Sequence, residues 1–131
     1  MSETVWIPAR RDVEVRAFTN AWYHQYATLR FSRPEQPFDT CSFEYQGEGN
    51  KAMWGGGLNS SGIRWVAQHS QRYKIETNTQ YSKNGSKYNH QTMPASRTLG
   101  LFNISMVLSE DDIDKDWNNS AVQFTWWTPP K

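Results

Sequence analysis

The sequence predicts an all-β protein, an antiparallel β-sandwich in a single domain that spans residues 1–131. Two observations predict this fold class. Apolar and polar residues alternate with a period of two in most stretches, and clusters of turn-forming residues separate those stretches. With 131 residues and 15% aromatic side chains, the chain can bury a sizeable core and does not have the composition of a disordered protein.

Each expected strand places alternate side chains on one face. In the first, Val13, Val15 and Ala17 share a face, with charged residues between them. Six further runs are rich in β-branched and aromatic residues, as half-buried strands are: residues 27–31, 41–45, 63–67, 73–81, 99–108 and 122–126. Asn84-Gly85 predicts a tight hairpin turn. Seven or more short strands at this spacing favour a sandwich.

The composition excludes several classes of protein. Fourteen basic and thirteen acidic residues give a net charge of +1, so no bulk field attracts nucleic acid. The single cysteine, Cys41, excludes an internal disulfide framework and a multi-cysteine metal site. No apolar run is long enough for a membrane span, and the opening MSETVWIPARR lacks the pattern of a signal peptide. Two localisations stay open, the cytoplasm and export by a non-classical route. No nucleophile motif or nucleotide-binding fingerprint predicts an enzyme.

The strongest chemical signal is an acidic segment between two expected strands, residues 110–119. Five of the thirteen acidic residues lie there, at Glu110, Asp111, Asp112, Asp114 and Asp116. Like charges at this density repel one another unless a cation neutralises them, and carboxylate and amide oxygens are the ligands that Ca²⁺ prefers. An EF-hand is excluded because its sixth position would be Trp117 and its twelfth Gln123. The alternative is a solvated acidic turn at a sheet edge.

The segment Glu110-Asp-Asp-Ile-Asp-Lys-Asp-Trp-Asn-Asn119 resembles the E-D-G-x-D-x-D-Y-N-D loop of the bacterial calcium-mediated fucose- and mannose-binding lectins (LecB-like). The opening residues 5–9 and 13–20, and the final strand 121–126, also resemble that family in order and polarity. The resemblance implies a nine-stranded antiparallel sandwich, two adjacent calcium ions, and a sugar whose hydroxyls complete the coordination. It also implies a homodimer or a higher homo-oligomer.

The resemblance assigns roles to residues of two regions. It implies that calcium is held by Asn20, Glu110, Asp114, Asp116, Asn118 and Asn119. It implies that the sugar is contacted by Ala21, Trp22, Tyr23, Asp111, Asp112, Asp114 and Asp116. Within the second set, residues 21–23 correspond to the loop that tunes which sugar is preferred. The remaining tryptophans are expected in the core or in an interface.

This chain departs from the family pattern at several positions. Asn119 stands where the family has an aspartate that bridges both ions, and Asp112 stands where it has a glycine. Trp22 and Tyr23 are far bulkier than the usual specificity-loop residues. The family's C-terminal carboxylate, a calcium ligand donated by a neighbouring subunit, has no clear match in residues 127–131. Two lost negative charges weaken at least one ion site. The number of calcium ions stays open, with four outcomes: two weakly bound ions, one ion, one ion that binds only together with ligand, or no ion.

These observations predict a non-enzymatic, calcium-dependent lectin that binds fucose, mannose or related glycans, without nucleic-acid or membrane partners. The main alternative is a divergent lectin-fold protein that has lost calcium and acts as a metal-independent glycan-binding or protein-interaction module. A glycosidase is less favoured because it needs two carboxyl groups roughly 5–10 Å apart across a cleft. Calcium-mediated membrane docking is a third alternative.

Overall fold

The computed structural model describes residues 2–33, 36–55, 63–66, 70–89, 91–110 and 119–130. These residues form nine strands: β1 (Ser2–Ile7), β2 (Val13–Arg33), β3 (Gln36–Ala52), β4 (Ile63–Val66), β5 (Tyr73–Lys83), β6 (Ser86–Asn89), β7 (Gln91–Leu99), β8 (Phe102–Glu110) and β9 (Ser120–Trp127). Every strand pair is antiparallel. The predicted all-β antiparallel fold, with about nine strands, is confirmed. In the described part of the chain, no helix is long and apolar enough to cross a membrane.

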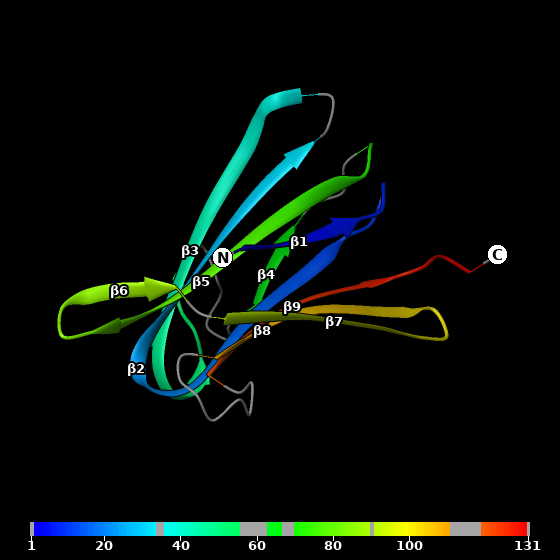
Figure 1. Ribbon diagram of the computed structural model, residues 1–131. Coiled ribbons are helices and arrows are strands. Elements are labelled where there is room, and N and C mark those ends of the chain that lie inside the picture. The colour runs from blue at the N-terminus through cyan, green and yellow to red at the C-terminus, as the bar shows by residue number, and fades with distance from the viewer. Residues whose placement is uncertain are drawn as a thin grey trace.

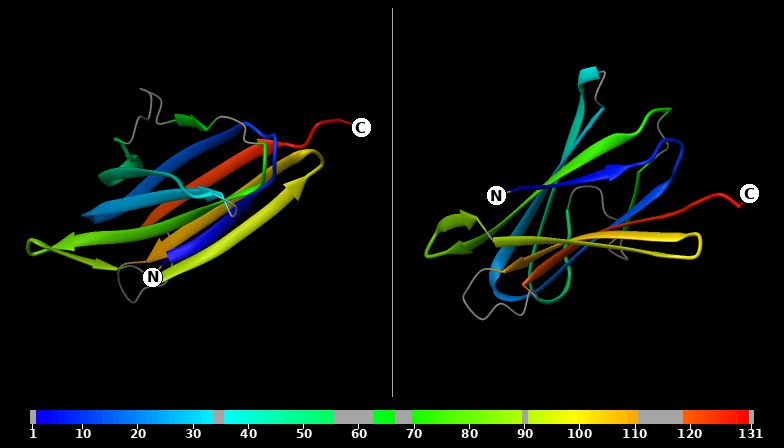
Figure 2. Two further views of the ribbon diagram at one scale, coloured as in Figure 1. Left: turned by 90° about the horizontal axis from the view of Figure 1, so that it is seen from above. Right: turned by 45° about the vertical axis from the view of Figure 1, so that its right-hand side comes forward.

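The strands form two layers that the long strand β2 connects (Figures 1 and 2). The first half of β2 pairs with β9, which continues to β8 and β7. Its second half pairs with β5, which continues to β1 and β6. Strand β3 follows both halves, with an irregularity in the register between Ala21 and Gln25. At the open edges the layers approach each other, and the Thr92 hydroxyl of β7 donates a hydrogen bond of 2.9 Å to Glu3 Oε1 of β1.

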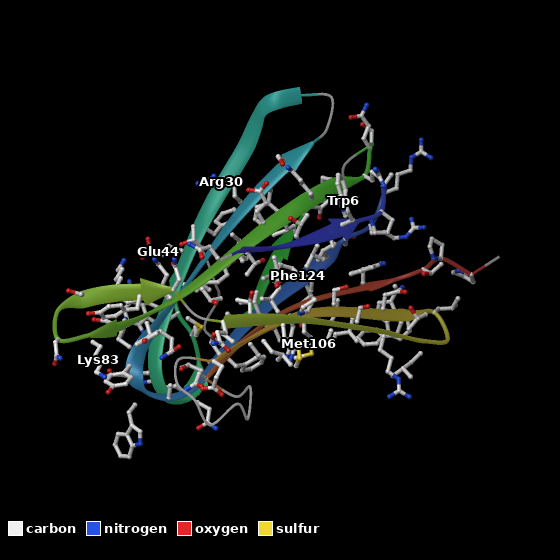
Figure 3. All side chains as sticks on the ribbon, viewed as in Figure 1. Trp6, Arg30, Glu44, Lys83, Met106 and Phe124 are labelled. Carbon is white, nitrogen blue, oxygen red and sulfur yellow. The ribbon has the colours of Figure 1, made fainter. Side chains whose placement is uncertain are left out.

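The core lies between the layers and is formed by alternate residues, as the period-two pattern requires. On β2, Val13, Val15 and Ala17 are fully buried, whereas the intervening side chains reach the surface. Figure 3 shows Phe124 of β9 between the layers. The other buried apolar side chains come from six strands and the segment after β3: Val5, Ile7, Ala27, Leu29, Phe31, Tyr45, Met53, Tyr73, Ile75, Val107 and Val122.

Two predicted boundaries are wrong. The expected strands at 13–17 and 27–31 are parts of one 21-residue strand, because the irregularity after Ala21 redirects β2 without ending it. The apolar run 99–108 is not one strand, since Gly100 adopts a positive φ of 62° and turns the chain between β7 and β8. Strand β7 was missed because both of its faces are polar or exposed, so it has no alternating pattern.

The predicted Asn84-Gly85 turn is confirmed. Asn84 and Gly85 have φ values of 53° and 80°, and the turn joins β5 to β6. Two successive left-handed residues are typical of the type I′ hairpin turn, which matches the twist of the strands it joins. The hairpin of β5 and β6 projects beyond the two layers, at the left of Figure 1.

Candidate calcium and carbohydrate site

The two ends of the acidic segment meet at β2. The backbone N–H of Asn20 donates to the carbonyl oxygen of Asn119 at 3.0 Å, and the Thr19 hydroxyl donates to the same oxygen at 3.1 Å. The backbone N–H of Asn119 donates to the carbonyl oxygen of Ser109 at 3.2 Å. These three bonds bring together Asn20, Glu110 and Asn119, which are three of the six predicted calcium ligands.

The strand register explains this convergence. Ser120 of β9 is paired with Thr19 of β2 on one side and with Ser109 of β8 on the other. The residue next to each member of this row therefore lies at the same end of the sheet. Sequence separation between these residues reaches 100 positions, so only the pairing of β2 with β9 places Asn20 beside the acidic segment.

Burial and chemistry at this point suit a hard cation. The Glu110 side chain is 1% exposed, Asn119 is half-buried and Asn20 is exposed. A buried carboxylate requires compensation by a cation or by hydrogen bonds. One carboxylate and two amides provide only oxygen donors toward a metal, a set that fits Ca²⁺ rather than zinc or copper.

The remaining predicted residues of the segment lie outside the described part of the chain: Asp111, Asp112, Asp114, Asp116 and Asn118. Within the described residues, no group of three His, Cys, Asp or Glu side chains could hold a metal ion. Most of the negative charge of the predicted site belongs to residues 111–118, so this finding leaves the calcium prediction untested.

The expected specificity residues lie at the irregularity of β2, directly after Asn20. Ala21 pairs with Gly49 and Gln25 pairs with Gly47, so three residues of β2 lie opposite Glu48 alone. This arrangement pushes Trp22 outward, and its side chain is 97% exposed. A pocket of about 300 Å³ is lined by Asn20, Ala21, Trp22 and Gly49. Two of the expected specificity residues, Ala21 and Trp22, therefore share a pocket with the predicted calcium ligand Asn20.

Contacts within the protein fix the bulged segment. The side-chain amide of the buried Gln25 donates to the Tyr23 carbonyl oxygen at 3.0 Å. A ring nitrogen of His24 lies 3.0 Å from Gln46 Oε1, and the His24 ring contacts Tyr26 and Trp54 edge-on. These contacts hold the backbone from Tyr23 to Gln25, directly after the exposed Trp22.

Sequence reasoning missed two tyrosines near this segment, of which the first contacts Tyr23 and the second contacts the first. The Tyr23 ring lies 5.8 Å from that of Tyr81 on β5, and Tyr81 lies 5.6 Å from Tyr88 on β6, measured between ring centroids. We call these three residues the tyrosine ladder. A signal was present in the sequence: a two-residue turn at 84–85 places residues 81 and 88 directly opposite each other.

Of the other described tryptophans, Trp126 is half-buried and packs against the core, as expected. Trp6, Trp54 and Trp127 are 43%, 52% and 65% exposed, so for these three the expected place in an interface stays a prediction. Trp65 and Trp117 have side chains outside the described part.

The model of the family described as "Fucose-binding lectin II (PA-IIL)" matches residues 5–128 of this chain. A comparison with curated proteins finds no match.

Solved structures with the same fold include the Chromobacterium violaceum lectin CV2L in complex with alpha-methyl-fucoside (22% identity, 96% of each chain, TM-score 0.59). The high-affinity mannose-binding lectin of Ralstonia solanacearum is 25% identical over 96% of each chain, with a TM-score of 0.60. The C-terminal domain of the BC2L-C lectin from Burkholderia cenocepacia is 18% identical over 98% of this chain and 100% of that domain, with a TM-score of 0.60. At 22% and 18% identity, the first and third similarities concern the fold alone.

Proposed function

Because this chain belongs to the fucose-binding lectin II (PA-IIL) family, we propose that it binds fucose, mannose or glycans that end in them, with calcium as a cofactor. The members of this family are lectins, so the chain is a carbohydrate-binding protein and not an enzyme. The sugar specificity, the calcium dependence and the individual site residues are parts of the proposal.

One observation carries this proposal: the convergence of Asn20, Glu110 and Asn119 at the ends of the acidic segment. Each ligand of a loop-bound ion has to be ordered before it contributes affinity, and ordering costs conformational entropy. Hydrogen bonds from β2 already fix Asn119, and the bond from the Asn119 N–H to the Ser109 carbonyl oxygen ties that end to the residue before Glu110. Part of the ordering that ion binding requires is therefore already present in the folded protein.

In the proposed complex, different residues bind the cation, accept hydrogen bonds from the sugar and determine which sugar fits. Glu110, Asn20 and Asn119 would hold the cation together with Asp114, Asp116 and Asn118. A bound cation would supply Lewis-acid coordination for hydroxyl groups of the sugar. Asp111 and Asp112 accept hydrogen bonds from the hydroxyls, and Ala21, Trp22 and Tyr23 limit which ring substituents fit. The exposed face of Trp22 adds apolar contact with the C–H groups of the sugar.

The metal-independent alternative is favoured by a specific feature of the site. The Asn119 carbonyl accepts hydrogen bonds from the Thr19 hydroxyl and the Asn20 N–H, and the Asn119 N–H donates to the Ser109 carbonyl oxygen, so protein hydrogen bonds join the two ends of the segment. A neutral Asn119 in place of the family's aspartate also lowers the charge available to a cation. In this alternative the pocket beside Trp22 binds glycans without calcium.

We also infer that the chain is one domain and forms homo-oligomers through the outer face of β7, β8 and β9. Alternate residues of β8 on this face are apolar and only half-buried: Phe102, Ile104, Met106 and Leu108. Leu99 and Trp127, which flank Phe102 in the register, are 54% and 65% exposed. Figure 3 shows Met106 on the side of this layer away from Phe124. Contiguous exposed apolar surface of this kind marks interaction sites.

The test is a melting-temperature series with excess calcium or with EDTA, in the presence of methyl fucoside, methyl mannoside or methyl galactoside. A ligand at a hundred times its Kd stabilises the folded state by about 2.7 kcal/mol. We expect calcium to raise the melting temperature and fucoside or mannoside to raise it further. A rise with sugar in EDTA would support the metal-independent alternative. No response to any sugar would contradict both.

A pair of variants tests whether the calcium-dependent rise in melting temperature comes from the acidic segment. Asp114→Asn should abolish the calcium response, because it removes one carboxylate of the predicted ion site. Asp12→Asn removes an exposed carboxylate between β1 and β2, far from Asn20 in the fold, and should leave the response unchanged. Equal responses in the two variants would refute the assignment of the acidic segment.

A further inference from the structure

The inner face of β5 leads directly to the proposed site. Ile75, Thr77 and Thr79 on this face are fully buried. The Ser109 hydroxyl of β8 donates to the Thr79 hydroxyl at 2.8 Å within the interior. Ser109 precedes Glu110, so Thr79 marks where the core ends and the site begins. The next residue on the same face of β5 is Tyr81.

Beyond Thr79 the hairpin of β5 and β6 extends past the layers (Figure 1). The register aligns Gln25 of β2, Tyr81 of β5 and Tyr88 of β6 in one row. Exposure increases along the row, from the buried Gln25 through the half-buried Tyr81 to Tyr88 at 47%. Tyr23, 37% exposed, packs against Tyr81 from the bulge of β2. Tyr23 directly follows Trp22 in the bulged segment, so the tyrosine ladder begins next to a residue that lines the pocket beside Asn20.

We propose that the tyrosine ladder of Tyr23, Tyr81 and Tyr88 is a second sugar subsite, which binds the penultimate residue of a glycan whose terminal residue occupies the calcium and carbohydrate site. This subsite rests on the proposed function. It makes the protein selective for oligosaccharides over the terminal monosaccharide.

The geometry of the ladder suits a pyranose ring. Successive ring centroids lie 5.8 and 5.6 Å apart and the ring planes are inclined by 34° and 31°, so neighbouring rings are tilted against each other rather than packed edge-on. Such rings offer apolar area to the C–H faces of a sugar, and their hydroxyl groups can bond to its oxygens. The Lys83 ammonium lies 5.7 Å from the Tyr23 ring centroid and provides a further donor at the rim. Figure 3 shows Lys83 on the projecting hairpin.

The composition of the hairpin favours a sugar over a protein partner. Strand β6 reads Ser-Lys-Tyr-Asn, all four residues are exposed, and Tyr88 is its one apolar side chain. The turn adds Asn84 and Gly85. A protein-docking surface of useful size has an apolar core of several aliphatic and aromatic side chains. A short row of aromatic rings bordered by polar residues is suited to a ligand with alternating apolar and hydroxyl surface.

The experiment compares affinities for a monosaccharide and an oligosaccharide by calorimetry. Methyl fucoside and methyl mannoside are the short ligands, and di- and trisaccharides that end in fucose or mannose are the long ones. We expect wild-type protein to bind at least one long ligand about tenfold more tightly than its terminal monosaccharide, the difference expected for one good aromatic contact. Tyr88→Ser should abolish that difference and leave monosaccharide affinity unchanged. Tyr88→Phe should retain most of it.

Trp6→Ser is the matched control, because Trp6 is an exposed aromatic residue on β1 that contacts Arg72 and belongs neither to the ladder nor to the bulged segment. It should keep the preference for the long ligand. The proposal is overturned if wild-type protein shows no preference, or if Tyr88→Ser lowers both affinities equally, as a purely structural role of the ladder would. If folded wild-type protein binds no sugar of either length, the proposed function itself fails.

Discussion

The hydrogen bond from Thr19 to Asn119 allows a quantitative test of how β2 holds the acidic segment. Thr19 is 2% exposed, and its hydroxyl donates at 3.1 Å to the Asn119 carbonyl oxygen. Thr19→Val removes this donor and keeps the side-chain shape. The carbonyl retains the bond from the Asn20 N–H, so no buried acceptor loses its last partner. The expected cost is therefore the net value of one hydrogen bond, about 0.5–1.5 kcal/mol, without the larger penalty of an orphaned group.

Thr77→Val is the matched control for this variant. Thr77 is fully buried on β5, and among the described residues its hydroxyl has no hydrogen-bond partner. The same chemical change there removes a buried hydroxyl whose desolvation no hydrogen bond compensates, so the stability of the protein should be unchanged or should rise. The change in the free energy of unfolding should therefore differ between the two variants, a loss for Thr19→Val and no loss or a gain for Thr77→Val, although both make the same substitution at a buried position.

Urea unfolding monitored by tryptophan fluorescence measures both effects. For a small domain, each kcal/mol shifts the urea midpoint by about 0.3–1 M. Thr19→Val should also weaken calcium binding severalfold, because the ends of residues 110–119 are held less firmly, whereas Thr77→Val should not. Equal loss of stability in both variants, or a loss above about 3 kcal/mol for Thr19→Val, would refute the hydrogen-bond reasoning.

Two further predictions concern the outer face and the hairpin. Met106→Glu places a charge in the apolar face of β8 and should convert an oligomer into a monomer, whereas Ser96→Glu on the other face of β7 should not. The molar mass is measured by light scattering after size exclusion, and an unchanged mass for Met106→Glu would argue against this interface. Gly85→Ala should cost about 1–2 kcal/mol, because an L side chain at a φ of 80° is strained although an added Cβ meets no atom within 4 Å. Ser86→Ala in the exposed β6 should stay within about 0.5 kcal/mol, and a similar loss in both variants by thermal unfolding would contradict the turn assignment.

The sequence predicted those parts of the fold that depend on local periodicity and turn chemistry. Alternation at Val13, Val15 and Ala17 identified a core face because strand side chains alternate between faces wherever the strand lies. Asn84-Gly85 identified a hairpin because two left-handed residues in succession require such residue types. Strand β7 escaped prediction because pairing with β8 sustains it, and pairing leaves no periodic pattern when both faces are exposed.

By itself the sequence also determined the chemistry of the candidate site: an acidic segment rich in oxygen donors, with Asn20 and residues 21–23 assigned by resemblance. Only the tertiary structure decided where these parts meet. The pairing of β2 with β9 puts Asn20 beside Asn119, and the pairing of β5 with β2 adds Tyr81 and Tyr88 to the surface that Tyr23 begins. Backbone pairing between distant strands depends on how the whole sheet closes around its core, and no local stretch of sequence contains that information.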